Sequence, residues 1–452
     1  MTDNITDIPR QSPLENSWLQ AKSKSYDSPR QFPLDITWQK KKGDDDRDYT
    51  LYGFVIDNNE SDPYASISYI EDNKYFTPAK MNFTTGEFEY GSWTDAWFIK
   101  GLKPCMLKYD GTVGYLLDPN DYTKKLDGTA SDISNTSYGG NAMVGIPLVY
   151  YKISHNETTN LTTVLVSDKQ VDDDFKCWSH IDINGDVIPY FYIAIYSHSY
   201  INPRYRSLSN NIYGASSLSS ELTRAKANNP SNKDIWNIDT YANRLLFQIL
   251  LLLMGKSRNS QARFGYSRCS SGGDSMSASY NGTANAKGLF WGNNANNTDL
   301  KLFGIENYWG ARSGRVAGLL YQNHIYKVKL TEGMYDGSTT ANYNDTGSGY
   351  IAMPFESNTT AASGGYINTM NISEYGFFPN TRTGSSSTYW CDYANGGTTD
   401  TGLRCPAMGM SNVGTSNTQQ GGIFSMHNNA TPTNTGTAIG TFISCRPLAG
   451  TE

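Results

Sequence analysis

The stretch Phe303-Gly-Ile-Glu-Asn-Tyr-Trp-Gly310 lies within a long Gly-, Asn-, Ser- and Thr-rich part of the chain that begins after Gly255. Only short apolar islands interrupt this part, whereas two helices are predicted just upstream of it. Two helices followed by short strands and long ordered loops predict the α+β fold class, with one irregular, loop-dominated face. The fold and function expected for the 452-residue chain therefore depend on which known sequence pattern this stretch resembles.

The two upstream helices are predicted from their capping residues and apolar pattern. Ser219 or Ser220 can cap the first helix, which runs to Ala227. Asp239 opens the second helix, which reaches Met254. Because the second helix is apolar on all sides, we expect other elements to cover it.

The stretch 303–310, followed by Gly318-Leu319, resembles the asparagine-tryptophan-glycine signature of the C-type lectin fold. The branch is the one shared by formylglycine-generating sulfatase-modifying enzymes and the variable proteins of diversity-generating retroelements. Residues 191–196 resemble the opening strand of this fold and residues 439–447 the closing strand, so that the similarity covers roughly 145–448. The signature residues are Gly304, Glu306, Asn307, Trp309, Gly310 and Arg446.

Two departures from the family bear on activity. After Trp309-Gly310 the family often has an aromatic–acidic–aromatic run, whereas this chain has Ala311-Arg-Ser-Gly-Arg315. The formylglycine enzymes use a close cysteine pair near the C-terminus, but here Cys405 lies 40 residues before Cys445. The oxidase activity is therefore not carried over.

The resemblance implies ligand binding. In the retroelement proteins the C-terminal part of the lectin-like domain presents diversified residues on a rigid scaffold, and here that part is about 385–437. Aromatic and amide side chains are typical of paratopes, and few charges suit neutral sugars. Alternatively, Asn, Gly and Thr merely fill turns. The candidate ligand-binding residues are Tyr389, Trp390, Asp392, Tyr393, Asn395, Ser411, Asn412, Asn417, Ser425, His427, Asn428 and Asn429.

The remaining chain is expected to hold three further parts. Alternating aromatic and β-branched residues between turn signals predict a small β-rich domain at 49–128. Pieces such as Asn82–Phe88 resemble the upstream part of tail or adhesin proteins from gut bacteriophages. A Ser/Thr/Asn/Gly-rich linker at 129–144 leads to the lectin-like domain at 145–452, and an extended arm occupies 1–48.

The arm contains a duplicated peptide. Residues 7–18 align with residues 27–38 at an offset of 20, with seven of twelve positions identical. Two Pro in each copy disfavour helix, so each copy is expected to be extended, with Leu and Trp as anchors for a partner. A second interpretation is an arm packed on its own protein. The candidate partner-docking residues are Pro13, Leu14, Trp18, Pro33, Leu34 and Trp38.

Composition excludes several classes of protein. Charged residues are 18% of the chain, and residues 331–452 contain no Lys, three Arg and eight acidic residues. Without a basic face, nucleic-acid binding is not expected. The longest apolar run, 245–254, is too short to span a bilayer, so membrane insertion is not expected.

The Cys and acidic residues predict neither a metal site nor a cofactor. No CxxC or Cys/His cluster occurs. Asp182-Ile-Asn-Gly-Asp186 partly mimics a calcium loop, but Asn184-Gly185 is better explained as a hairpin turn. We expect mostly reduced, buried cysteines, although Cys391, Cys405 and Cys445 could pair in an oxidising medium.

These observations favour a bacteriophage receptor-binding protein, or adhesin, on the virion surface, in the tail or a fibre, synthesised in the host cytoplasm. Its expected partners are a bacterial surface glycan or protein receptor and, through the arm, other virion proteins. A homo-oligomer, with a trimer favoured, would add avidity. The chain is not expected to be an enzyme. The alternatives are a virion-associated glycan-degrading enzyme and a structural fibre or decoration protein.

Overall fold

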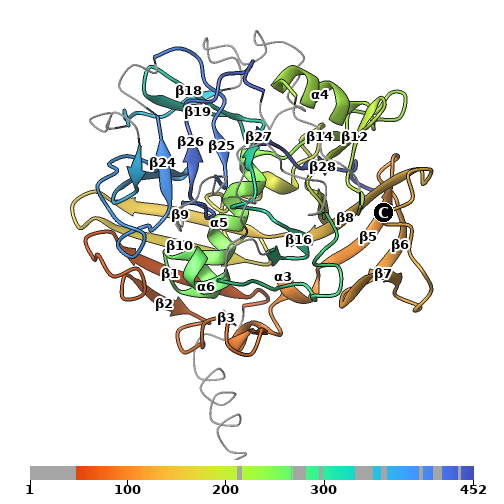
Figure 1. Cartoon of the computed structure of the whole chain (residues 1–452). Coiled ribbons are helices and arrows are strands. Elements are labelled where there is room, and N and C mark those ends of the chain that lie inside the picture. The colour runs from red at the N-terminus through yellow and green to blue at the C-terminus, as the bar shows by residue number, and fades with distance from the viewer. Residues whose placement is uncertain are drawn as a thin grey trace, which may run out of the picture. The chain divides into compact units, whose positions relative to one another are not determined.

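The fold is dominated by β-sheet. Of the residues that the computed structural model describes, 35% lie in strands and 11% in four helices and short 3-10 turns. The expectation of an α+β fold class is therefore wrong (Figure 1). The error arose because many short segments expected to be loops pair with one another as strands of two to four residues. The described residues are 47–210, 216–265, 267, 281–294, 299–330, 350–357, 364–396, 401–410, 420–435 and 439–451.

The first sheet has four antiparallel strands in the order β2-β1-β10-β9. Apolar side chains alternate along its central pair, so that buried Phe54 lies opposite buried Val164. Tyr52 lies on the same face and its ring stacks on that of Trp97, with centroids 5.3 Å apart. The strands are β1 (Leu51–Asp57), β2 (Ile67–Glu71), β9 (Tyr150–Asn156) and β10 (Leu161–Ser167).

The second sheet has seven strands in the order β14-β28-β11-β8-β5-β6-β7. All eight residues of β8 are buried, as expected for a central strand that is covered on both faces. Strand β28 lies between β11 and β14, and Cys445 is the register partner of both Tyr192 and Trp236. The strands are β5 (Lys103–Lys108), β6 (Val113–Asp118), β7 (Asp121–Lys125), β8 (Gly140–Pro147), β11 (Tyr190–Ala194), β14 (Trp236–Ile238) and β28 (Ile443–Cys445).

The third sheet is built from short strands in the order β21-β24-β26-β25-β17-β27. It consists of β17 (Ser313–Arg315), β21 (Gly365–Tyr366), β24 (Tyr393–Asn395), β25 (Ala407–Met408), β26 (Met426–His427) and β27 (Ile439–Gly440). Smaller sheets are formed by β3 (Lys80–Asn82) with β4 (Glu87–Glu89), β12 (Ser199–Ile201) with β13 (Arg204–Arg206), β15 (Lys301–Leu302) with β16 (Ile305–Glu306), β18 (Leu319–Gln322) with β19 (Ile325–Val328) and β20 (Ile351–Ala352), and β22 (Met370–Ser373) with β23 (Gly376–Pro379).

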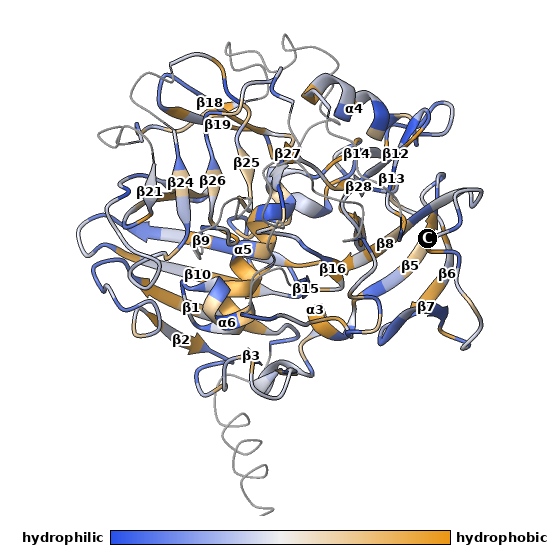
Figure 2. Ribbon diagram, in the orientation of Figure 1, coloured by the Kyte–Doolittle hydropathy of each residue, from blue (hydrophilic) through white to orange (hydrophobic). Residues whose placement is uncertain are grey.

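The four helices in the described residues are α3 (Trp97–Lys100), α4 (Leu218–Lys226), α5 (Tyr241–Gly255) and α6 (Ser260–Phe264). Every residue of α5 is buried, which confirms that the apolar second helix is covered on all sides. Figure 2 shows its apolar residues at the centre of the fold. Thr240 caps α5 by accepting a hydrogen bond from Asn243 N, and Lys256 ends it in the left-handed conformation.

Helix α5 contacts elements of all three large sheets. The Tyr69 hydroxyl of β2 donates to Leu253 O at 2.6 Å, and the ring of Phe191 in β11 packs on Phe247 with centroids 6.4 Å apart. Gln248 Nε2 donates to Ile423 O, just before β26, at 3.2 Å. A single apolar helix therefore forms the core that the sheets share.

A buried cluster of charges fixes the first turn of α5. Arg244 Nε donates to Asp239 Oδ2 at 2.7 Å, and the Tyr308 hydroxyl donates to the same oxygen at 2.9 Å. The guanidinium also lies over the Tyr308 ring, 3.6 Å from its centroid, and Arg244 Nη1 donates to Tyr308 O at 2.8 Å. Since Tyr308 belongs to the stretch 303–310, this cluster joins that stretch to the central helix.

Two segments differ from what the sequence predicts. Within the region 49–128, which was expected to be β-rich, residues 97–100 form the short helix α3, whose Phe98 and Ile99 are buried in the core. The linker expected at 129–144 contains the start of β8, which pairs with β5 on one side and β11 on the other. Strands from 49–128 therefore share both large sheets with strands from 145–452.

Residues 51–452 form one compact unit. The docking arm expected at 1–48 lies outside the described residues except for its last two positions, and so do all six candidate docking residues. Within the described ranges, no helix combines the length and the apolar character needed to cross a membrane.

Replacing Arg244 with Met should lower the free energy of unfolding by about 3–5 kcal/mol, because it leaves the Asp239 carboxylate buried without its cation. Urea denaturation measures this difference. Lys100→Met is the matched control, since it removes the cation of an exposed pair, Lys100 Nζ to Asp95 Oδ1 at 2.6 Å, and should cost at most about 1 kcal/mol. Equal losses in the two variants would contradict the role assigned to the cluster.

Candidate ligand-binding face

The register of the third sheet brings four side chains to one face. Tyr366 of β21 pairs with Tyr393 of β24, and Asn395 of β24 pairs with His427 of β26. Tyr393 and Asn395 are two positions apart on one strand, so all four side chains lie on the same side. The intervening Ala394 is buried on the other side. We call Tyr366, Tyr393, Asn395 and His427 the neutral face.

Each side chain of the neutral face is half-buried, so part of it reaches solvent. The rings of Tyr366 and Tyr393 meet edge to face, with centroids 5.5 Å apart and planes at 86°. Asn395 Oδ1 accepts a hydrogen bond from Asn428 N at 3.1 Å, which fixes its amide. Two aromatic rings, an amide and an imidazole can stack on a ligand and exchange hydrogen bonds with it.

Four of the candidate ligand-binding residues lie in the interior instead. Trp390 is fully buried and packs its ring on Phe424, with centroids 4.9 Å apart. Ser425 Oγ accepts from Met410 N at 2.7 Å, and Asn428 Nδ2 donates to the Tyr326 hydroxyl at 2.7 Å. With buried Asp392, these side chains hold the strands of the neutral face from beneath and do not form its surface.

Asp392 is the most consequential of the four. Its carboxylate accepts hydrogen bonds from Phe424 N at 2.8 Å and from Gln261 Nε2 at 3.2 Å. It therefore joins α6 to the segment that leads into β26. Gly422 packs so closely on the carboxylate that no side chain would fit at that position. Burial raises the pKa of Asp392 to about 7, although the hydrogen bonds to its charged form act in the opposite direction.

The other candidates are dispersed or undescribed. Tyr389 is half-buried with φ +58°, and its backbone N donates to Ser61 O at 2.7 Å, which directs it away from the neutral face toward the first sheet. Asn429 is exposed and follows β26. Ser411, Asn412 and Asn417 lie outside the described residues.

The signature residues named from the sequence make contacts that stabilise the fold, or adopt backbone conformations that the fold requires. Gly304 has φ +81°, and a Cβ there would lie 2.5 Å from the Tyr122 hydroxyl. Glu306 accepts from Gly282 N at 2.9 Å, and burial raises its pKa to about 8. Trp309 Nε1 donates to Gly265 O at 3.2 Å, whereas Asn307 and Gly310 both have positive φ. Arg446 Nη2 donates to Thr240 Oγ1 at 3.0 Å, beside the cap of α5.

The departure at 311–315 has a structural counterpart. Residues 313–315 form β17, which pairs with β25 and β27. Arg315 there forms a fully buried ion pair with Glu221 of α4, with Nη1 and Oε2 3.0 Å apart. A buried charge pair therefore joins β17 to α4.

Neither a metal centre nor a disulfide is found among the described residues. No group of three or more His, Cys, Asp or Glu side chains in the described ranges could hold a metal ion. Cys391, Cys405 and Cys445 are free and buried, as are Cys105 and Cys177, whereas Cys269 is not described. Burial raises the pKa of the Cys177 thiol to about 11, so that it stays protonated near neutral pH.

Tyr366 was not among the residues expected to bind a ligand. This residue lies outside the window 385–437, and only the pairing of β21 with β24 brings it to the neutral face. The preceding Gly364-Gly365 pair was the available signal, because it marks a close approach between backbones. A Cβ at Gly364 would lie 2.9 Å from Ala394 O.

Comparison with known protein families and curated proteins identified no relative of this chain. No protein-family description matches the chain, and no curated protein matches it in sequence.

Replacing Asp392 with Asn should make the free energy of unfolding less dependent on pH between about 4 and 7. In the native protein burial raises the Asp392 pKa to about 7, so between that value and 3.8 the native state binds a proton that the unfolded state releases. The wild type should therefore lose stability relative to the variant as pH rises through this window, by on the order of 4 kcal/mol.

Urea denaturation of both proteins at a series of pH values measures this difference, because all other groups contribute equally to both. Asp95→Asn serves as the control, since it makes the same substitution at an exposed carboxylate. Parallel profiles for wild type and Asp392→Asn would contradict the assignment.

Proposed function

We propose that this chain is a bacteriophage receptor-binding protein whose neutral face binds a ligand on the bacterial surface. The observation that carries the proposal is the neutral face itself. Tyr366, Tyr393, Asn395 and His427 come from three strands of one sheet, are partly exposed, and stand on buried residues that fix the strands. Pre-organised aromatic and amide groups bind with little loss of conformational entropy.

The arrangement of the strands supports the proposal. The expected opening strand, β11, pairs directly with the expected closing strand, β28, so that residues 195–442 return to their starting point. Arg446, just beyond β28, and Tyr308, within the signature stretch, both contact the first turn of α5. These contacts hold the middle and the end of this long segment against α5, so side chains on its surface can vary without loosening the core.

The chemistry of the neutral face favours an uncharged ligand, such as the hydroxyl-rich surface of a glycan. No Lys, Arg, Asp or Glu belongs to the face, and the carboxylate of Asp392 is buried beneath it. An enzyme that cleaves glycans by acid–base chemistry would need a pair of carboxyl groups at the bond to be broken. Since Asp392 is occupied by backbone and amide donors, the binding function is the better supported one.

Replacing Tyr393 with Ala should weaken binding to the bacterial surface at least about tenfold, which corresponds to about 1.4 kcal/mol. The measurement uses the full chain with a panel of gut bacteria, and then with surface polysaccharide purified from a strain that binds. Tyr75→Ala is the matched control, because Tyr75 is 80% exposed at a distant loop. The affinity should change little with salt, since no charges meet.

Three results would contradict this assignment. Equal binding by the Tyr393 and Tyr75 variants would place the ligand elsewhere. New reducing ends in the polysaccharide would favour the glycan-degrading enzyme, and absence of binding to every strain would favour a structural fibre or decoration protein.

Deleting residues 1–45 should abolish incorporation into virus particles but leave ligand binding by the purified chain intact. The reason is that the duplicated peptide, with Leu14 and Trp18 repeated as Leu34 and Trp38, offers two copies of one anchor pattern to a virion partner. Replacing the four anchors with Ala tests the same idea without shortening the chain. Particles that still carry either variant would contradict docking through the arm.

A further inference from the structure

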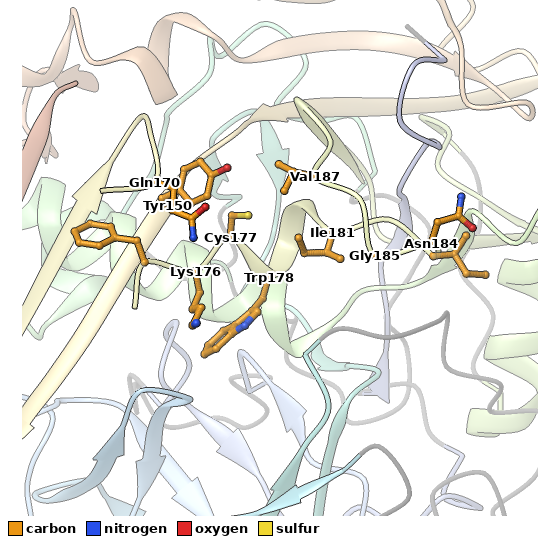
Figure 3. Close-up of a pocket in the computed structure, with 11 residues that line it drawn as sticks. Tyr150, Gln170, Lys176, Cys177, Trp178, Ile181, Asn184, Gly185 and Val187 are labelled. Atoms are coloured by element: carbon orange, nitrogen blue, oxygen red, sulfur yellow. The ribbon is translucent and has the colours of Figure 1, made fainter. Parts of the chain in front are cut away.

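A hollow of about 530 Å³ lies on a different part of the molecule from the neutral face. Its walls come from the start of β9 and from the connection between β10 and β11. In Figure 3, Tyr150 and Gln170 lie to one side of Cys177, whereas Ile181 and Val187 lie to the other. We propose that this hollow is a second binding site, for a short neutral oligosaccharide.

The aromatic and apolar lining matches the faces of sugar rings. Tyr150, Phe175 and Trp178 line the hollow together with Ile181 and Val187. Val187 is 44% exposed, although it is an apolar residue next to an aromatic wall. Burying such side chains against the C–H faces of a ligand is favourable, at roughly 25 cal/mol per Å² of apolar surface.

Among the polar side chains that line the hollow, amides outnumber charged groups. Gln170 and Asn184 are both exposed, and an amide can both donate to and accept from sugar hydroxyls. Among the described residues that line the hollow there is no carboxylate, and the single cation, Lys176, donates from Nζ to Asp173 O at 2.6 Å. The nearby Asp172 is paired with Lys152, with Oδ2 and Nζ 3.2 Å apart, so the amide-rich lining favours a neutral ligand over a charged one.

The lining is held rigidly before any ligand arrives. The Asp182 carboxylate accepts from Asn184 N at 2.8 Å, Asp186 N at 3.0 Å and Ala449 N at 3.0 Å, and so fixes the turn that carries Asn184. The Trp178 ring stacks on Tyr375 with centroids 5.7 Å apart. Groups that are already ordered lose little entropy on binding.

The length of the ligand follows from a neighbouring hollow. A second hollow, of about 460 Å³, shares Ile183 and Asn184 with the first and is also lined by Lys233, Asp234 and Leu448. Asp234 is paired with Lys226, with Oδ2 and Nζ 3.0 Å apart. The turn at 182–186 therefore lies between two adjacent depressions. A ligand of two or three sugar rings could occupy both, with Asn184 contacting its middle.

The test uses the full chain and four neutral trisaccharides: maltotriose, cellotriose, a β-1,3-linked glucose trimer and chitotriose. Saturation-transfer NMR and titration calorimetry should detect saturable binding of at least one. Val187→Lys should weaken that binding at least about tenfold, because the longer charged side chain fills the hollow. Val113→Lys is the matched control, since Val113 is 38% exposed outside the hollow, and should leave the affinity unchanged.

Further variants separate this site from the neutral face. Asn184→Ala should weaken trisaccharide binding, whereas Tyr393→Ala should not, so the second site can fail or hold independently of the proposed function. Binding of none of the four trisaccharides would overturn the inference. It would also be overturned by equal affinities of the Val187 and Val113 variants, or by binding of charged oligosaccharides alone.

Discussion

The buried contact between Asp239, Arg244 and Tyr308 is the constraint on which most of the structure depends. It places a charge pair at the start of a fully buried helix, where each partner would be costly to bury alone. The pair fixes the rotation of α5 about its axis and so determines which apolar residues of the helix pack against each sheet. Tyr308 belongs to the stretch 303–310, and its contacts with Asp239 and Arg244 hold this stretch against one helix.

The features best predicted from the sequence are those that local residue pattern and burial determine. The second helix was expected to run from Asp239 to Met254 and to be covered, and α5 at 241–255 is buried throughout. Alternating aromatic and β-branched residues predicted a β-rich region at 49–128, and β1 to β7 lie within it. The fold class was wrong because strands of two or three residues, such as β25 and β26, show no detectable period. Their pairing is decided by distant partners.

The candidate site shows the same contrast between features that local sequence determines and features that distant contacts determine. Composition directed attention to 385–437, yet composition cannot tell Tyr393, which reaches solvent, from Trp390, which packs in the core three positions earlier. Burial of Asp392 depends on Gln261 and Phe424, and the contribution of Tyr366 depends on the register of β21. Such long-range pairings leave no trace in a single sequence, apart from glycines that permit close approach.

The position of β28 has a consequence for how the chain folds. This strand fills the slot between β11 and β14, yet it is synthesised about 250 residues after β11. Until it emerges from the ribosome, both neighbours present unpaired edges that could capture strands from other nascent chains. Folding of the seven-stranded sheet must therefore wait until β28 has been synthesised, and slow synthesis or crowding of nascent chains would lower the yield more than the stability of the folded protein.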